Sequence, residues 1–324
     1  MQRTARAYWV TAPGRGEIRP AALPEPGDGD VVVRTLYTGV SRGTESLVFG
    51  GRVPESLRQD MRAPHQEGEF PGPVKYGYLN SGVVEQGPPG LVGREVFCLY
   101  PHQTRYVVPA DAVVPLPTEV PARRAVLAGA VETAVNALWD AAPRVGDRVC
   151  VVGAGMVGCC VARLLSALPG VRLRLVDTDP GRERAAERLG VPFAAPGAAQ
   201  DGCDLVFHTS ASEEGLALSL GLLGTEGEVI ELSWYGDRQV RLPLGEAFHP
   251  RRLAVRCSQV GRVSPARSAR RTLRDRLALA VGLLADPAYD ALITGESPFE
   301  ELPEVMPGLA DGRIPALCHT IAYA

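Results

Sequence analysis

Three glycines at the spacing G-x-G-x-x-G, Gly153, Gly155 and Gly158, form the pattern that most directly indicates a chemistry. They follow an apolar run that ends at Val152, and the acidic Asp177 ends the next apolar run. In a strand–turn–helix unit, such glycines let backbone amides approach a pyrophosphate, and the acidic residue accepts hydrogen bonds from a ribose. The motif therefore predicts a dinucleotide site. The charge of Asp177 favours NAD(H) over NADP(H), because it repels the extra phosphate of NADP(H).

Further cofactor contacts are expected around the same motif. The helix that opens here would present the backbone amides of Met156 and Val157 to the phosphates, because a helix N-terminus carries unpaired N–H groups. Arg182 follows the acidic residue and would weaken its preference against a phosphate. Ligands of doubly wound sheets bind at the carboxyl ends of strands. We therefore expect the nicotinamide side to be lined by Thr209, Ser233 and Ser258 for the cofactor and by Trp234, Tyr235 and Arg262 for a substrate.

The chain has two regions that differ in their predicted secondary structure. Residues 1–118 contain short β-type runs separated by glycine and proline, which is typical of a compact β-rich domain, and residues 43–73 are polar enough to predict a long loop. From about residue 120, helical and strand patterns alternate, which indicates βαβ units around a parallel sheet. A long helix is expected from 266 to 284. The predicted fold class is α/β, with a β-rich domain beside a doubly wound parallel sheet.

The composition narrows the function classes. Among 324 residues, 45% are hydrophobic and 22% are charged, and the net charge of −3 argues against a general nucleic-acid or membrane-surface binder. No apolar run approaches the ~20 residues that a membrane-spanning helix needs. The seven cysteines include no CxxC pair, which fits scattered thiols in a reducing compartment. We therefore expect a soluble cytoplasmic protein that acts on a small molecule.

Three stretches are similar to motifs of one enzyme family. They are Val31–Glu45, Gly77–Glu85 and Ala128–Ala134. With these stretches around the glycine motif, the chain resembles the medium-chain dehydrogenase/reductase superfamily. Its Ser-x-Gly-Thr-Glu and Gly-Tyr pattern is most similar to the branch of the bacteriochlorophyllide side-chain dehydrogenases. The resemblance implies a GroES-like catalytic domain from residues 1–119 and 262–324, a Rossmann NAD(H)-binding domain from 120–261, and a homodimer or homotetramer.

The chain departs from this family at the positions that hold catalytic zinc. Ser41 or Arg42 replaces the first ligand cysteine, Tyr78 replaces the histidine, and the third ligand position falls on Gly129. Zinc requires thiolate, imidazole or carboxylate ligands in a tetrahedral set, and none of these residues supplies one. The four closely spaced cysteines of the family's structural zinc lobe are missing as well. The sequence therefore predicts no bound metal.

Without zinc, hydrogen-bond donors must manage the reacting oxygen and its proton. Tyr78 is the first candidate for proton donor or base, and Lys75, three residues before it, would lower its pKa. Thr44 aligns with the hydroxyl that relays protons in zinc-containing members, and Glu132 lies on the helix near the lost third ligand. Each assignment has a structural alternative. Tyr78 could be a wall tyrosine beside a surface lysine, Lys75. Thr44 could be a turn hydroxyl and Glu132 a helix-surface carboxylate.

Ser41, Arg42 and His102 are predicted to face a substrate, with Glu45 orienting its neighbours. The leading hypothesis is a zinc-independent oxidoreductase that transfers a hydride between NAD(H) and an alcohol or ketone. The alternatives are an NAD(P)H-dependent enoyl or quinone reductase, and a nucleotide-binding protein without catalysis.

Overall fold

The computed structural model describes residues 4–324, and they form two compact units. The first unit contains the described residues up to Gly129 together with Val281–Pro287 and Ile293–Ala324. The second contains Ala130–Ala280 and Ala288–Leu292. Among the described residues, no helix combines the length and the apolar character needed to cross a membrane.

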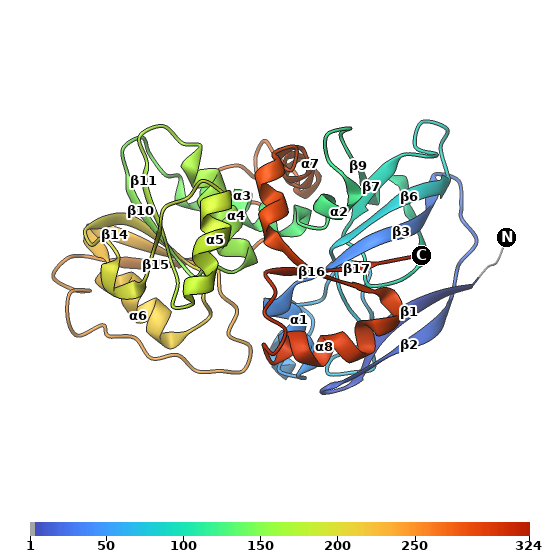
Figure 1. The fold of residues 1–324 in the computed structure, drawn as a ribbon, viewed down its shortest axis with the longest axis horizontal. Helices are drawn as coiled ribbons and strands as arrows, with labels where there is room; N and C mark the ends of the chain where they lie inside the picture. Colours follow the sequence, from blue (N-terminus) through green and yellow to red (C-terminus); the bar gives the residue numbers. More distant parts are fainter. Residues whose placement is uncertain (1–3) are drawn as a thin grey trace. The chain divides into compact units, whose positions relative to one another are not determined.

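The first unit is built on two sheets (Figure 1). The smaller has the order β2-β1-β5-β4. The larger has the order β16-β17-β3-β6-β7-β9, with β8 paired to β3. The strands are β1 (Thr4–Ala12), β2 (Arg15–Ala22), β3 (Asp30–Val40), β4 (Glu67–Gly68), β5 (Val74–Lys75), β6 (Asn80–Gln86), β7 (Glu95–Cys98), β8 (Arg105–Pro109), β9 (Val113–Pro115), β16 (Ile293–Pro298) and β17 (Cys318–Ala322). Helices α1 (Arg42–Phe49), α2 (Ala122–Ala125) and α8 (Leu302–Ala310) accompany them. The C-terminal strand β17 pairs antiparallel with β3, so the end of the chain completes the sheet that its beginning starts.

The second unit is a parallel sheet in the order β12-β11-β10-β13-β14-β15. Its strands are β10 (Arg148–Val152), β11 (Arg172–Val176), β12 (Phe193–Ala194), β13 (Cys203–His208), β14 (Leu223–Glu231) and β15 (Ala254–Cys257). Its helices are α3 (Ala128–Ala141), α4 (Met156–Ser166), α5 (Glu183–Arg188), α6 (Glu213–Gly221) and α7 (Leu273–Leu283), and Figure 1 shows α4, α5 and α6 beside the strands. Val149 to Val152 are at most 4% exposed, as expected for a strand covered on both faces. The predicted combination of a GroES-like β-rich domain and a Rossmann sheet is confirmed.

Two predicted elements differ from the structure. The expected loop from 43 to 73 begins with α1, because Leu47, Val48 and Phe49 are apolar enough to be buried as one helical turn. The helix expected from residue 266 begins only at Leu273, and turns precede it.

The units also divide at other residues than the sequence suggested, at 129/130 and near 281 instead of 119/120 and 261/262. A buried side chain accounts for the second difference. Arg276 of α7 donates hydrogen bonds to Glu132 and Asn136 of α3 and to the backbone carbonyls of Val260 and Arg262. These contacts hold the first turns of α7 within the second unit.

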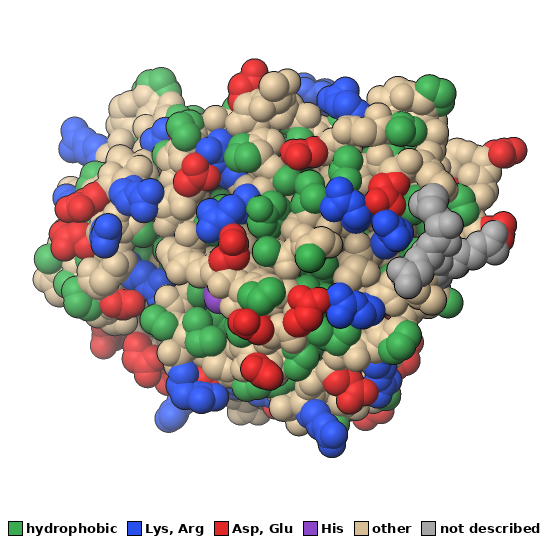
Figure 2. Space-filling model, turned by 45° about the vertical axis from the view of Figure 1, so that its right-hand side comes forward, with side chains coloured by type: hydrophobic (Ala, Val, Ile, Leu, Met, Phe, Trp, Pro, Cys, Tyr) green, Lys and Arg blue, Asp and Glu red, His purple; other side chains and the backbone are tan. Residues whose placement is uncertain are grey.

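On the face drawn in Figure 2, positively and negatively charged side chains are interspersed, with no extended region of one sign.

Candidate functional site

The glycine motif forms the turn between β10 and α4. Gly153 has φ +110°, and a Cβ there would lie 2.7 Å from the amide nitrogen of Ser210. A Cβ at Gly158 would overlap the carbonyl oxygen of Gly153, so close packing of the helix on the turn requires glycine at both positions. A Cβ at Gly155 would meet nothing within 4 Å. The chain is therefore open at the one glycine where a ligand's phosphate would approach.

The helix at this turn leaves amides available to an anion. Gly155 caps α4 without a side-chain hydrogen bond, and the first amide bonded within the helix is that of Cys159, to the carbonyl of Gly155. The amides of Met156, Val157 and Gly158 therefore have no intrahelical acceptor. An open cradle of N–H groups at a helix N-terminus fits a diphosphate.

Asp177 follows β11 and lies against the same turn. Its Oδ2 accepts a hydrogen bond of 2.6 Å from the amide of Ala154, and its Oδ1 accepts one of 2.8 Å from the amide of Asp179. Arg182 forms an ion pair of 3.1 Å with Asp179. The guanidinium of Arg182 is therefore engaged by Asp179, and the carboxylate of Asp177 is held against the glycine turn through the amide of Ala154.

The residues predicted at the strand ends are held by the protein itself. Thr209 follows β13 and donates a hydrogen bond of 2.7 Å to the carbonyl of Gly153, so it braces the glycine turn. The hydroxyl of Ser233, after β14, accepts from the amide of Ala211. Ser258 follows β15 and donates to Asp140 of α3. Trp234 and Tyr235 are partly exposed and Arg262 is exposed, so all three are accessible to a ligand.

Tyr78 lies between β5 and β6 in the first unit, and the side chains of Ser41 and Thr44 lie near enough to its hydroxyl to favour the ionised phenol. Burial, followed by the negative charge of Glu45, raises the pKa of Tyr78 to about 12, although the two hydroxyl contacts oppose this shift. Tyr78 is therefore a neutral phenol at neutral pH. It can give a proton to an oxygen atom, and it is a poor base.

The predicted effect of Lys75 on Tyr78 is wrong. Lys75 is only 1% exposed, and its ammonium donates hydrogen bonds to Glu67 and to Oε1 of Gln103, the latter at 2.6 Å. It also lies 5.3 Å from the centre of the Tyr100 ring. The lysine is neither a partner of Tyr78 nor the surface residue of the alternative interpretation. It is a buried structural cation whose own pKa is lowered, chiefly by burial.

A run of buried polar groups stands behind Tyr78. Glu45 accepts a hydrogen bond from the amide of Ser41 and contacts Nε2 of His102 at 2.9 Å. Nδ1 of His102 lies 2.7 Å from Oγ1 of Thr38. His102 is 1% exposed with both ring nitrogens engaged, so it cannot face a substrate as predicted.

Thr38 continues the run to the hydroxyl of Tyr323 at 3.2 Å. No sequence pattern indicated Thr38 or Tyr323, because they meet only through the pairing of β3 with β17. Among the predicted substrate contacts of this unit, Ser41 is buried against Tyr78, and Arg42 is exposed on α1.

Glu132 is removed from the catalytic candidates. It is 4% exposed and forms a 3.1 Å ion pair with Arg276, which is 1% exposed. Burial raises the pKa of Glu132, and the charge of Arg276 opposes the shift. The carboxylate therefore holds α3 to α7, and it is not the helix-surface group of the alternative interpretation.

The three positions aligned with zinc ligands include two that meet in space. A Cβ at Gly129 would lie 2.5 Å from Cδ2 of Leu79 and 3.8–3.9 Å from the ring of Tyr78. An apolar side chain and a phenol therefore fill the place where the family holds a ligand set. Within residues 4–324, no group of three or more His, Cys, Asp or Glu side chains could hold a metal ion. The residues present do not fit zinc.

Curated relatives match the sequence, and two of them carry the same name. The chain is 29% identical over 250 residues to the 2-desacetyl-2-hydroxyethyl bacteriochlorophyllide A dehydrogenase of Rhodobacter capsulatus, covering 71% of this chain and 72% of that protein. It is 31% identical over 188 residues to the enzyme of the same name from Cereibacter sphaeroides, covering 51% and 54%. No protein-family model matches the chain.

Solved structures match over nearly the whole chain. L-idonate 5-dehydrogenase of Escherichia coli has a TM-score of 0.80 at 15% identity, over 99% of each chain. A structure from Sinorhizobium meliloti, bound to NADP, has a TM-score of 0.77 at 16% identity, over 99% of this chain and 100% of that one. An alcohol dehydrogenase of E. coli complexed with NADH has a TM-score of 0.76 at 14% identity, over 99% of each chain. Identities this low establish the fold alone.

The relatives support an oxidoreductase of the dehydrogenase type. Sequence and fold together confirm that the chain resembles the medium-chain dehydrogenase/reductase superfamily and, within it, the branch of the bacteriochlorophyllide dehydrogenases.

Proposed function

We propose that the protein is an NAD(H)-dependent oxidoreductase of an alcohol/ketone pair, and that a tyrosine hydroxyl takes the place of zinc. The observation that carries the proposal is Tyr78, a neutral phenol beside the side chains of Ser41 and Thr44, at the position that aligns with a metal ligand of the family it resembles. The names of the two relatives include a hydroxyethyl group, which is the alcohol side of such a pair.

The second unit supplies the cofactor site. Solved structures of this fold bind NADP or NADH, and the open turn at Gly155 with the amides of Met156 and Val157 fits the diphosphate of either. Asp177 supports NAD(H), because its carboxylate is held against the turn and would repel a ribose phosphate. When bound, the nicotinamide supplies or accepts the hydride.

The first unit manages the proton. In the reductive direction Tyr78 donates its proton to the substrate oxygen as the carbonyl becomes an alkoxide, and Ser41 and Thr44 stabilise the phenolate that forms. Burial, followed by the negative charge of Glu45, raises the pKa of the phenol and so favours its protonated form. Because the pKa of Tyr78 is raised to about 12, the residue is protonated at neutral pH, which is the form that ketone reduction requires.

Substitution of Tyr78 tests the proposal. Tyr78→Phe should lower kcat for ketone reduction by about 10²–10⁴-fold, the usual contribution of a general acid, and leave the Kd for NADH unchanged. Tyr76→Phe is the matched control, because Tyr76 is a buried neighbour whose ring contacts that of Tyr78 edge-on.

Three results would contradict parts of the proposal. Full activity of the Tyr78→Phe protein would remove the tyrosine as proton donor. Stoichiometric zinc in the purified active protein, lost together with activity on chelation, would remove zinc independence. No calorimetric affinity for NADH or NADPH would remove the oxidoreductase itself.

A further inference from the structure

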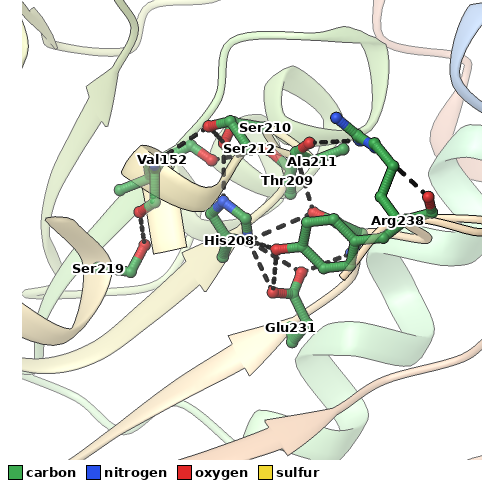
Figure 3. A network of polar contacts seen from close by, with 12 residues as sticks. Val152, His208, Thr209, Ser210, Ala211, Ser212, Ser219, Glu231 and Arg238 are labelled. Carbon is green, nitrogen blue, oxygen red and sulfur yellow. Dashed lines mark hydrogen bonds and ion pairs between the residues drawn. The ribbon is translucent and has the colours of Figure 1, made fainter. Parts of the chain in front are cut away.

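The second unit contains a carboxylate, an imidazole and a hydroxyl in line, at the ends of β13 and β14. Nδ1 of His208 lies 2.8 Å from Oε2 and 2.9 Å from Oε1 of Glu231, and Nε2 lies 2.7 Å from Oγ of Ser210 (Figure 3). These contacts match the arrangement in which a base activates a nucleophile while a third group orients the base. Neither the candidate proton donor nor the phosphate cradle uses them.

Several donors hold the carboxylate in its ionised form. Besides His208, Glu231 accepts hydrogen bonds from the amide of Ser233 at 2.7 Å and the hydroxyl of Tyr235 at 3.0 Å. Burial alone would raise the pKa of Glu231, but the contacts with His208 and Ser233 outweigh it and lower that pKa. An ionised carboxylate only accepts hydrogen bonds, so the proton of the neutral imidazole sits on Nδ1. Nε2 is then left to accept the proton of Ser210.

The hydroxyl end of this line is accessible, in contrast to a similar line in the first unit. His208 is completely buried and Ser210 is exposed. In the line Glu45–His102–Thr38 the hydroxyl residue is itself completely buried. Of these two hydroxyls, only that of Ser210 can therefore contact a molecule from solution, whereas that of Thr38 is buried.

The neighbouring helix is shaped around the serine. A Cβ at Gly215 of α6 would overlap Oγ of Ser210 and lie 2.9 Å from Nε2 of His208, so glycine leaves the space that the contact needs. Ser212 caps α6 and places its hydroxyl 2.9 Å from that of Ser210. The helix thus begins beside the hydroxyl, and the amides of its first turn lack intrahelical acceptors.

We propose that Ser210 is an activated nucleophile that reacts with carboxylic esters. Oγ of Ser210 bonds to the acyl carbon as its proton passes to Nε2 of His208. The ester C–O bond then breaks, and the alcohol leaves with that proton. Water repeats the sequence on the acyl-serine, releasing the carboxylic acid. The amide of Gly215 is taken by the Ser212 hydroxyl, so the amides of Glu213 and Glu214 stabilise the negative charge on the acyl oxygen, and Glu231 stabilises the imidazolium. This activity needs no coenzyme, so it stands or falls separately from the proposed oxidoreductase.

A fluorophosphonate probe tests the proposal, because it is attacked by activated serines and releases fluoride. In the full-length protein, the probe should label Ser210 selectively over the exposed Ser268, as located by peptide mass spectrometry. Ser210→Ala should abolish labelling, and Ser268→Ala should leave it unchanged. Loss of the base in His208→Gln should slow labelling by at least about 100-fold. Glu231→Gln should slow it as well, with p-nitrophenyl acetate hydrolysis falling in parallel.

Two results would overturn the inference. One is a wild-type protein that is not labelled, or that is labelled at Ser268 as readily as at Ser210. The other is a His208→Gln protein, folded by circular dichroism, that reacts as fast as the wild type.

Discussion

Replacing Arg276 by methionine should strongly destabilise the second unit. The guanidinium is 1% exposed and donates to Oε1 of Glu132 at 3.1 Å, to Oδ1 of Asn136 at 2.5 Å, and to the carbonyls of Arg262 and Val260. Its removal leaves the buried carboxylate of Glu132 unpaired, which costs about 3–5 kcal/mol in comparable buried pairs. The two carbonyls and the amide oxygen also lose a donor.

A second substitution separates the cost of the unpaired charge from the cost of the lost hydrogen bonds. Glu132→Gln removes the charge of the carboxylate but keeps an acceptor for Arg276, so we expect a smaller loss of about 1–3 kcal/mol. In the double variant no buried charge remains unpaired at Glu132. The combined loss should therefore fall short of the sum of the single losses by more than about 0.5 kcal/mol.

Urea denaturation gives these free energies, and hydrogen exchange of peptides from α3 and α7 gives their location. We expect faster exchange in both helices of the Arg276→Met protein, because the side chain joins α7 to α3. A loss below about 1 kcal/mol, or strict additivity in the double variant, would refute the reasoning. So would exchange that increases only outside these helices.

Two further predictions concern the cofactor site. Gly158→Ala should abolish NADH binding measured by fluorescence, because its Cβ would overlap the backbone of the turn. Gly155→Ala should weaken NADH binding but preserve folding, because its Cβ would meet nothing within 4 Å. Equal effects of the two substitutions on the melting temperature would contradict this prediction. Asp177→Asn should weaken NADH binding by about 10–100-fold, corresponding to a charged hydrogen bond of about 1.5–3 kcal/mol, and should narrow the gap to NADPH. An unchanged ratio of the two dissociation constants would show that Asp177 does not select the cofactor.

The sequence predicted the glycine turn well because local geometry determines it. Gly153 and Gly158 must be glycine for reasons contained within one strand–turn–helix unit, so the spacing carries the information. The start of α7 was predicted too early because turns precede it, and Thr272 and Asp275 cap the helix at Leu273 through reciprocal hydrogen bonds. The contacts of Arg276 with Glu132 and Asn136 were not predicted either, because these residues lie more than a hundred positions apart.

The buried polar contacts of the first unit could not be predicted either, because they also join residues far apart in the sequence. His102 looked like a substrate residue in a turn, yet it is buried between Glu45 and Thr38, which arrive from α1 and β3. Lys75 looked like a partner of Tyr78 because it is three residues away, but on the strand β5 it is turned toward Glu67 and Gln103. Sequence distance therefore misplaced both groups, whereas the identity of Tyr78 as the candidate donor required only the alignment of a motif.

The packing around Tyr78 also shows that no single substitution would create a zinc-ligand set at these positions. Restoring histidine at position 78 would still leave Gly129 without a ligand, and any side chain at 129 would meet Cδ2 of Leu79 at 2.5 Å from its Cβ. Leu79 is 1% exposed, so it has no free space into which it could move. A cysteine or histidine at 129 therefore requires a smaller residue at 79. The phenol, the leucine and the glycine therefore form one packed arrangement, and a ligand side chain at 129 would have to displace part of it.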